Sequence, residues 1–295
     1  MPRAEVIDLT AEHGGIDHGA LASGWDWRWG GWASWRLSGP LLGPAAVAVV
    51  LDVVTAWTRT PEWYLGPALV SPALPLAVVL VAWMGFGSLG AARDGARAWR
   101  EFLLAGGLAV AATALAYARA EGWRDVAGVV MTAAGEEIVY RVASVVVLGA
   151  LFARVAGRDW RSPARWGSGP GILALVASAL VFSALPGHVG QMTGAASVVP
   201  FASLAIVLGY AVLRTGSVLP AIVAHVLLDL TALAYLGGHI GTNARVVMGA
   251  ATLVGLASGA MLAGRRLGLR RRVPAVIDLR AGDDVDAVRP SVPAG

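Results

Sequence analysis

Long apolar runs alternate with short polar segments along the chain. Runs close to the length of about 20 residues at which a helix spans the hydrocarbon core of a bilayer occupy residues 41–57, 66–90, 102–118, 126–153, 170–186, 195–213, 217–236 and 246–264. Backbone amides in lipid must be hydrogen-bonded within their own segment, so runs of this length are expected to be helices. The pattern predicts an all-α fold: a polytopic membrane helical bundle with about eight transmembrane helices.

Two polar tails flank the predicted bundle, which occupies residues 41–264. Residues 1–40 are interpreted as a cytoplasmic N-terminal arm that ends in the tryptophan-rich stretch WDWRWGGWASW, residues 25–35. Tryptophan favours the membrane interface, so an interfacial anchor is expected, with a partner-binding patch as the alternative. Residues 265–295 are expected to form a basic and then disordered cytoplasmic tail.

The composition agrees with a membrane protein and sets its expected orientation. The chain is 57% hydrophobic and 14% charged, and all 23 basic residues are arginine. The arginines concentrate in three alternate loops, at 93–100, 154–165 and 265–272, which is the positive-inside pattern. We therefore expect a multi-pass protein of the cell membrane with both termini in the cytoplasm. We expect the arginines to contact the head groups of membrane lipids, and we expect no nucleic acid as a partner.

Three ionisable residues interrupt the apolar run 126–153, in the stretch GEEIVYR. Each costs roughly 2.5–3.5 kcal/mol at the centre of a membrane helix. Glu137 and Arg141 stand four residues apart on one helical face, in the order that favours an ion pair. Glu136 points about 100° away and is left without that partner, which suits a general base. The alternative is that all three only hold the bundle together through ion pairs.

Two further polar positions occur in later apolar runs. His225 and Asp229 lie four residues apart in 217–236, where the acid can fix the imidazole tautomer or share a ligand with it. A histidine that is only hydrogen-bonded in the core is the alternative. His188 follows the run 170–186 and can equally be a loop histidine. Asp52, in the first run, is interpreted as a satisfied structural or water-facing acid.

The expected topology brings the candidate residues to a similar depth. With cytoplasmic termini and a rise of 1.5 Å per residue, they fall within about one or two helical turns of a common level. We expect them to meet in one cavity below the extracytoplasmic surface. The residues are Glu136, His188, His225 and Asp229.

The sequence EEIVYR, the histidine of LPGH and the sequence HVLLD together resemble motifs of the CAAX-protease and bacteriocin-processing (CPBP, or ABI) family of intramembrane proteases. The likeness covers about residues 126–236. The middle motif departs from the family pattern, which has phenylalanine four residues before its histidine. Ala184 stands at that position and Phe182 lies six residues before His188. Asp229 stands where many members have asparagine.

The resemblance implies an intramembrane endopeptidase, either a metalloprotease or a glutamic protease, with a membrane-associated protein or peptide as substrate. Glu136 would activate the water that attacks the peptide carbonyl. The resemblance implies either zinc or no cofactor. The sequence contains no HExxH motif. The resemblance assigns orientation of the site to Glu137 and Arg141. It assigns water positioning, metal binding or oxyanion stabilisation to His188, His225 and Asp229.

Two other functions remain open at this point. Buried acids and histidines can serve as a relay in a proton-coupled transporter, although the sequence shows only one clear helix break, at Pro186-Gly187. A catalytically silent family member, acting as an immunity factor or scaffold, is the second alternative, which the altered middle motif leaves open.

Overall fold

The computed structural model describes residues 37–58, 63–65, 68–85, 89, 93–189 and 195–266. Most of this part is helical, which confirms the all-α class, and a short antiparallel hairpin of two strands is the exception. The tryptophan-rich stretch and the tail beyond residue 266 lie outside the described residues, so those predictions stay predictions. In chain order the elements are α1 (Gly39–Trp57), β1 (Trp63–Leu65), β2 (Ala68–Val70), α2 (Ala73–Met84), α3 (Arg93–Ala98), α4 (Arg100–Glu121), α5 (Trp123–Glu136), the π-helix η4 (Glu137–Ser144), α6 (Val145–Val155), the 3₁₀-helix η5 (Pro163–Arg165), α7 (Ser168–Ser183), α8 (Pro186–Val189), α9 (Ala195–Thr215), α10 (Leu219–Leu236) and α11 (Thr242–Arg266).

Within the described residues, five helices are long and apolar enough to cross a membrane: Gly39–Trp57, Arg100–Glu121, Trp123–Val155, Leu219–Leu236 and Thr242–Arg266. Shorter apolar helices cover Ala73–Met84, Ser168–Ser183 and Phe201–Thr215. The multi-pass membrane architecture is thus supported, whereas the predicted count of eight transmembrane helices is not confirmed.

The predicted span 66–90 differs most from the structure. Within it, Ala68–Val70 form strand β2 of the two-stranded sheet, and helix α2 runs for only 12 residues. At 1.5 Å per residue it is about 18 Å long, well short of the roughly 30 Å hydrocarbon core. Two residues limit α2: Pro72 stands at its N-cap, and Gly85 follows it with a positive φ of 83°. A count of apolar residues alone does not detect these boundaries.

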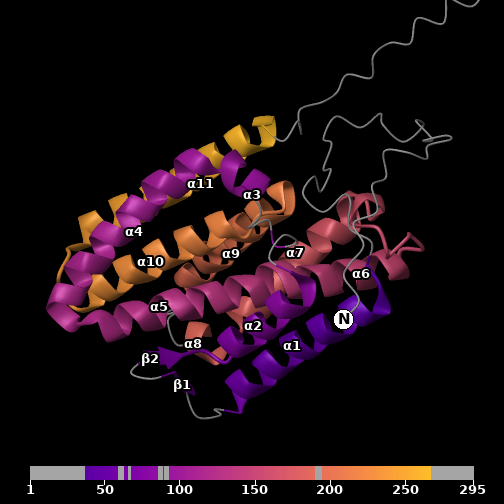
Figure 1. Cartoon of the computed structure of the whole chain (residues 1–295), viewed down its shortest axis with the longest axis horizontal. Helices are drawn as coiled ribbons and strands as arrows, with labels where there is room; N and C mark the ends of the chain where they lie inside the picture. The colour runs from indigo at the N-terminus through magenta and orange to yellow at the C-terminus, as the bar shows by residue number, and fades with distance from the viewer. Residues whose placement is uncertain are drawn as a thin grey trace, which may run out of the picture.

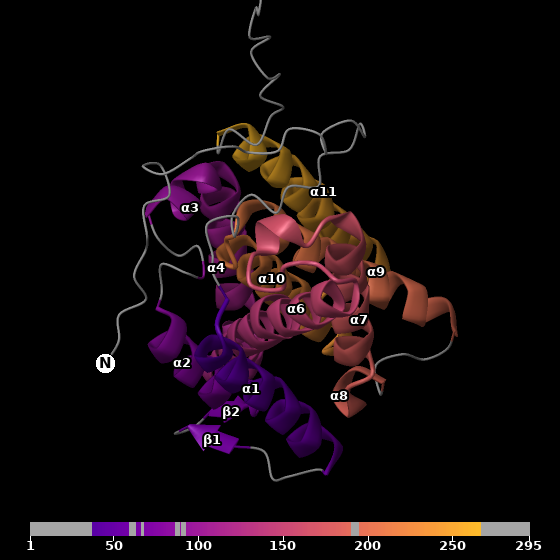
Figure 2. The same cartoon turned by 90° about the vertical axis from the view of Figure 1, so that its right-hand side faces the viewer.

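One long helix forms the centre of the bundle. Elements α5, η4 and α6 continue into one another over the 33 residues Trp123–Val155, a length of about 50 Å. This helix contacts α1, α2, α4, α7, α9 and α10. The long helices run side by side along the molecule (Figure 1), and the end-on view shows α6 between α1 and α7, both of which it contacts (Figure 2). Residues Glu136 to Arg141 therefore lie at the middle of the fold.

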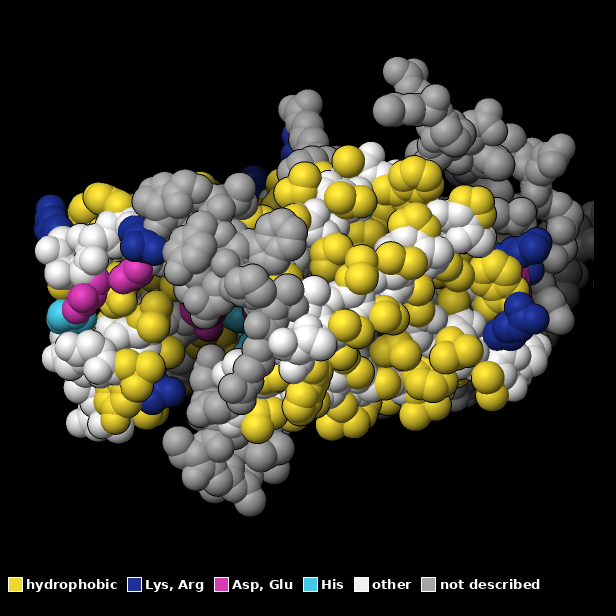
Figure 3. Space-filling view, turned by 90° about the horizontal axis from the view of Figure 1, so that it is seen from below, with side chains coloured by type: hydrophobic (Ala, Val, Ile, Leu, Met, Phe, Trp, Pro, Cys, Tyr) yellow, Lys and Arg dark blue, Asp and Glu magenta, His cyan; other side chains and the backbone are white. Residues whose placement is uncertain are grey.

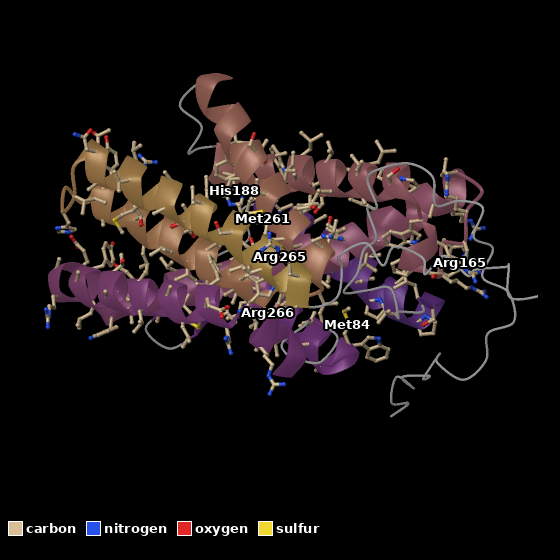
Figure 4. All side chains as sticks on the ribbon, turned by 90° about the horizontal axis from the view of Figure 1, so that it is seen from above. Met84, Arg165, His188, Met261, Arg265 and Arg266 are labelled. Carbon is tan, nitrogen blue, oxygen red and sulfur yellow. The ribbon has the colours of Figure 1, made fainter. Side chains whose placement is uncertain are left out.

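The outer surface is largely apolar. Hydrophobic side chains cover most of the face in Figure 3, and arginines gather toward its two ends. On α1, for example, Val47 and Val50 are 57% and 59% exposed. A broad exposed apolar surface of this kind fits contact with lipid chains. At the end of α11, Arg266, which Figure 4 labels, pairs with Glu101 and ties α11 to α4.

Close packing of α2 against the central helix depends on Gly135, the residue just before Glu136. A Cβ atom at this position would lie 2.7 Å from the backbone nitrogen of Leu74 and 2.8 Å from its Cα. Backbone atoms cannot rotate away as a flexible side chain can. The absence of a side chain at Gly135 thus sets the distance between α2 and the residues of the site.

We predict that Gly135→Ala destabilises the protein by about 1–3 kcal/mol, because the added methyl group overpacks the contact with α2. Thermal unfolding of the purified protein in detergent measures the effect. Gly107→Ala in α4 is the matched control, since no atom lies within 4 Å of its added methyl group. Alanine is the better helix former, so this control should unfold at the same or a higher temperature. Equal melting temperatures for the two variants would contradict the packing argument.

Candidate active site

A π-helix carries the charged stretch of the central helix. The segment Glu137–Ser144 is wound more widely than the α-helices on either side, a local distortion that is rare and frequent at functional sites. The side chains of Glu137 and Arg141 are 0% and 1% exposed. Such buried charges require partners close by.

Glu137 contacts two ionisable side chains, Arg141 and His225. Its Oε2 lies 3.4 Å from Nε of Arg141, four residues later, and its Oε1 accepts a hydrogen bond of 2.9 Å from Nδ1 of His225 on α10. Arg141 in turn places its guanidinium carbon 4.2 Å from the ring centroid of Phe182 on α7, a cation–π contact. The predicted pairing of Glu137 with Arg141 is therefore present, and it extends to two further helices.

Glu136 lies beside two imidazoles. Its Oε2 is 3.7 Å from Nε2 of His188 and 3.9 Å from Nε2 of His225. All three residues are at most 9% exposed. The structure therefore brings together, from three separate elements, the acid and the two histidines that the sequence analysis placed at one depth.

The partners of the two histidines determine which nitrogen faces Glu136. Nδ1 of His188 lies 2.7 Å from the backbone carbonyl of Phe182, which only accepts, so this nitrogen carries the proton and donates it. Nδ1 of His225 likewise donates to the carboxylate of Glu137. Both rings therefore turn Nε2 toward Glu136, with the orientation fixed by the other nitrogen.

Phe182 explains how the altered middle motif still builds the site. Helix α7 ends one residue later, and the four-residue helix α8 turns the chain so that the His188 ring lies 4.1 Å from the Phe182 ring, centroid to centroid. Figure 4 labels His188 near the base of the projecting end of α9. The spacing from phenylalanine to histidine is two residues longer than in the family pattern, and the chain turns through α8 so that the histidine returns to the phenylalanine.

Asp229 lies at the edge of the cluster. Its Oδ2 is 3.4 Å from Nε2 of His225, one helical turn earlier, and its side chain is 41% exposed. Solvent exposure therefore increases across the site, from the fully buried Glu137 to the half-exposed Asp229.

The described residues contain no group of three or more His, Asp or Glu side chains arranged to hold a metal ion. The resemblance names His188, His225 and Asp229 as the zinc set. Its metal role stays a prediction, and no step below depends on a metal.

Sequence reasoning did not assign roles to two aromatic residues of the site. Phe182 contacts His188, His225 and Arg141, and its position six residues before the histidine was the available signal. Tyr140 belongs to the EEIVYR motif, and its hydroxyl donates a hydrogen bond to Asp52 on α1. Asp52 is therefore a satisfied acid inside the bundle and not a water-facing one.

Comparison with known proteins places this cluster within a family domain. Residues 119–231 match the family model described as type II CAAX prenyl endopeptidase, Rce1-like. The segment runs from the end of α4 to α10 and contains every candidate site residue named in the sequence analysis except Asp52. No curated protein and no solved structure matches the chain. The family resemblance derived from the three motifs is confirmed over this segment.

We predict that Arg141→Met destabilises the protein by about 3–5 kcal/mol, because it leaves the carboxylate of Glu137 buried without its cation. Urea or thermal unfolding in detergent measures the loss. Arg165→Met is the control: Arg165 is 72% exposed and pairs with Asp159 at 3.6 Å, so its loss should cost at most about 1 kcal/mol. Similar losses in both variants would show that the buried pair contributes no more than an exposed one.

Proposed function

We propose that this protein, whose residues 119–231 form a domain of the Rce1-like type II CAAX prenyl endopeptidase family, is an intramembrane endopeptidase that hydrolyses a peptide bond through a water activated by Glu136. The observation that carries the proposal is the convergence of Glu136 Oε2 with the Nε2 atoms of His188 and His225, at 3.7 and 3.9 Å. These atoms face one another inside an apolar bundle, where positioned polar groups act on a substrate with little competition from water.

The first step is attack by water on the scissile carbonyl carbon. A water in contact with Glu136 and His188 transfers one proton to the Glu136 carboxylate, while its other O–H bond stays intact and donates a hydrogen bond to Nε2 of His188. The water oxygen then forms a bond to the carbonyl carbon. The π electrons of the carbonyl group move to the carbonyl oxygen, which becomes an oxyanion. A general base held in reach of its proton contributes typically 10²–10⁴-fold to such a step.

The second step is departure of the amine. Glu136 returns the proton to the peptide nitrogen as the carbon–nitrogen bond breaks, which leaves a carboxylic acid and a free amine. In its charged form His225, flanked by the carboxylates of Glu137 and Asp229, donates from Nε2 to the oxyanion that precedes this step. Glu137 and Arg141 hold His225 in place through the hydrogen bond to its Nδ1.

The exterior of the bundle and the family match together suggest the substrate class. A site inside a lipid-facing bundle is suited to a membrane-associated protein or peptide. The family model is described as a prenyl endopeptidase, so a peptide that ends in a prenylated CAAX sequence is the first substrate to test. The arginine pattern leads us to place both termini in the cytoplasm, and membrane lipids surround the helices.

We predict that Glu136→Gln lowers cleavage of a farnesylated CAAX reporter peptide by about 10²-fold or more, because the amide cannot accept the proton of water. The assay uses the purified protein in liposomes and follows release of the terminal tripeptide by mass spectrometry. Glu121→Gln, which changes an exposed glutamate paired with His239, is the control and should cleave as the native protein does. Full activity in the Glu136→Gln variant would refute the assigned base.

A second prediction concerns metal dependence. The steps proposed above use only protein groups and water, so we expect prolonged treatment with EDTA or 1,10-phenanthroline to leave the cleavage rate within about twofold of the untreated rate. Metal analysis of the purified protein accompanies the assay. Loss of activity on chelation and its recovery on adding Zn²⁺ would favour the zinc mechanism instead.

A further inference from the structure

An acid outside the family domain reaches the site from α1. Asp52 is 3% exposed, whereas its neighbour Leu51 is 46% exposed. Ala45, Ala48 and Asp52 form the buried face of α1, which packs against η4, α2, α6 and α8. An acid on a membrane helix is costly, so its place on this inward face points to a specific partner.

That partner is Tyr140, whose hydroxyl donates to Oδ2 of Asp52. Tyr140 is fully buried and lies on the central helix four residues after Glu136, about one turn along. Its backbone carbonyl accepts a hydrogen bond of 2.6 Å from Ser178 on α7. Three helices therefore meet at this tyrosine: α1 through the phenol, α7 through the backbone, and the central helix that carries it.

The ring of Tyr140 extends the connection to the second half of the site. It packs edge-on against Phe182 at 5.3 Å between centroids. Phe182 in turn packs on the His188 ring and accepts the hydrogen bond from its Nδ1. Tyr140 is thus connected to Glu136 along the central helix and to His188 through Phe182.

Helix α1 also contacts η4, which begins one residue after Glu136, and α8, which carries His188. The titratable residues of these two segments are Glu137, Tyr140, Arg141 and His188. The sequence of α2, residues 73–84, contributes none. Asp52 is therefore placed at the rear of the site, with the half-exposed Asp229 at its edge.

We propose that Asp52 is a positioning residue for peptide hydrolysis: it accepts the hydrogen bond of Tyr140 and thereby fixes the distance between Glu136 and His188. The inference rests on the proposed function and adds to it an element that the family match does not include. On this proposal α1 helps to position the site residues through Asp52, in addition to packing in the bundle. An error of about 1 Å in the position of a catalytic group can cost up to about 10²-fold in rate.

The test compares three variants on the farnesylated reporter peptide. Asp52→Leu and Tyr140→Phe each remove the hydrogen bond, so each should lower kcat by about tenfold or more, with KM within about twofold of the native value. Asp52→Asn keeps an acceptor oxygen near the same place and should retain kcat within about threefold. The double variant Asp52→Leu/Tyr140→Phe should be no slower than either single variant, because both remove the same contact.

Thr215→Val provides the structural control. Thr215 accepts a buried hydrogen bond of 3.0 Å from Nε1 of Trp99, away from the site. Its loss should lower the melting temperature by an amount similar to that in Asp52→Leu but leave kcat unchanged. Three results would overturn the proposal: full kcat in Asp52→Leu, an Asp52→Asn variant as slow as Asp52→Leu, or an equal loss of kcat in Thr215→Val.

A measurement without a substrate separates this proposal from the proposed function. If the native protein fails to cleave the reporter peptide, the proposed function is contradicted for this substrate. The coupling between Asp52 and Glu136 is then tested by melting temperatures alone. Asp52→Leu and Glu136→Gln should then shift the melting temperature non-additively, because the two acids share one network. Additive shifts would show that Asp52 holds α1 in place without acting on Glu136.

Discussion

The need to neutralise charge inside an apolar bundle determines how this protein is built. Glu137 and Arg141 are shielded almost completely from solvent, and an isolated charge there would destabilise the fold by several kcal/mol. The arrangement that results spreads one ion pair over three helices: Glu137 binds Arg141 on its own helix and His225 on α10, and Arg141 covers Phe182 on α7. The interaction that makes the charges tolerable also fixes the orientation of His225.

This neutralised pair leaves Glu136 available for chemistry. It is the neighbour of Glu137 in sequence, yet it points into a different environment, where the Nε2 atoms of His188 and His225 face it. Two adjacent glutamates thus take different roles because they project about 100° apart on a helix. The π-helix that begins at Glu137 widens the turn at this point, and Gly135 allows α2 to approach just before it. Local backbone geometry and electrostatics therefore support the same site.

The sequence predicted the parts of the structure that depend on periodicity and on the cost of buried charge. The helical class, the central apolar run and the meeting of Glu136 with His188 and His225 follow from spacing and depth along helices. The boundaries of α2 did not follow, because a proline and a positive-φ glycine divide an apolar run whose mean composition still resembles a full span. The contribution of Phe182 was hidden for a different reason: its spacing from His188 depends on the path of α8, which is tertiary information. Asp52 was recognised as buried, but its partner Tyr140 lies 88 residues away.

The central claim is that Glu136 and the two imidazoles surround the reacting carbonyl group. An experimental structure of the Glu136→Gln variant with an uncleaved farnesylated peptide tests it most directly. The account predicts that the scissile carbonyl carbon lies near the side chains of positions 136, 188 and 225, with room for a water about 3–3.5 Å from that carbon. A peptide bound elsewhere, for example beside the exposed pair of Glu121 and His239, would contradict it.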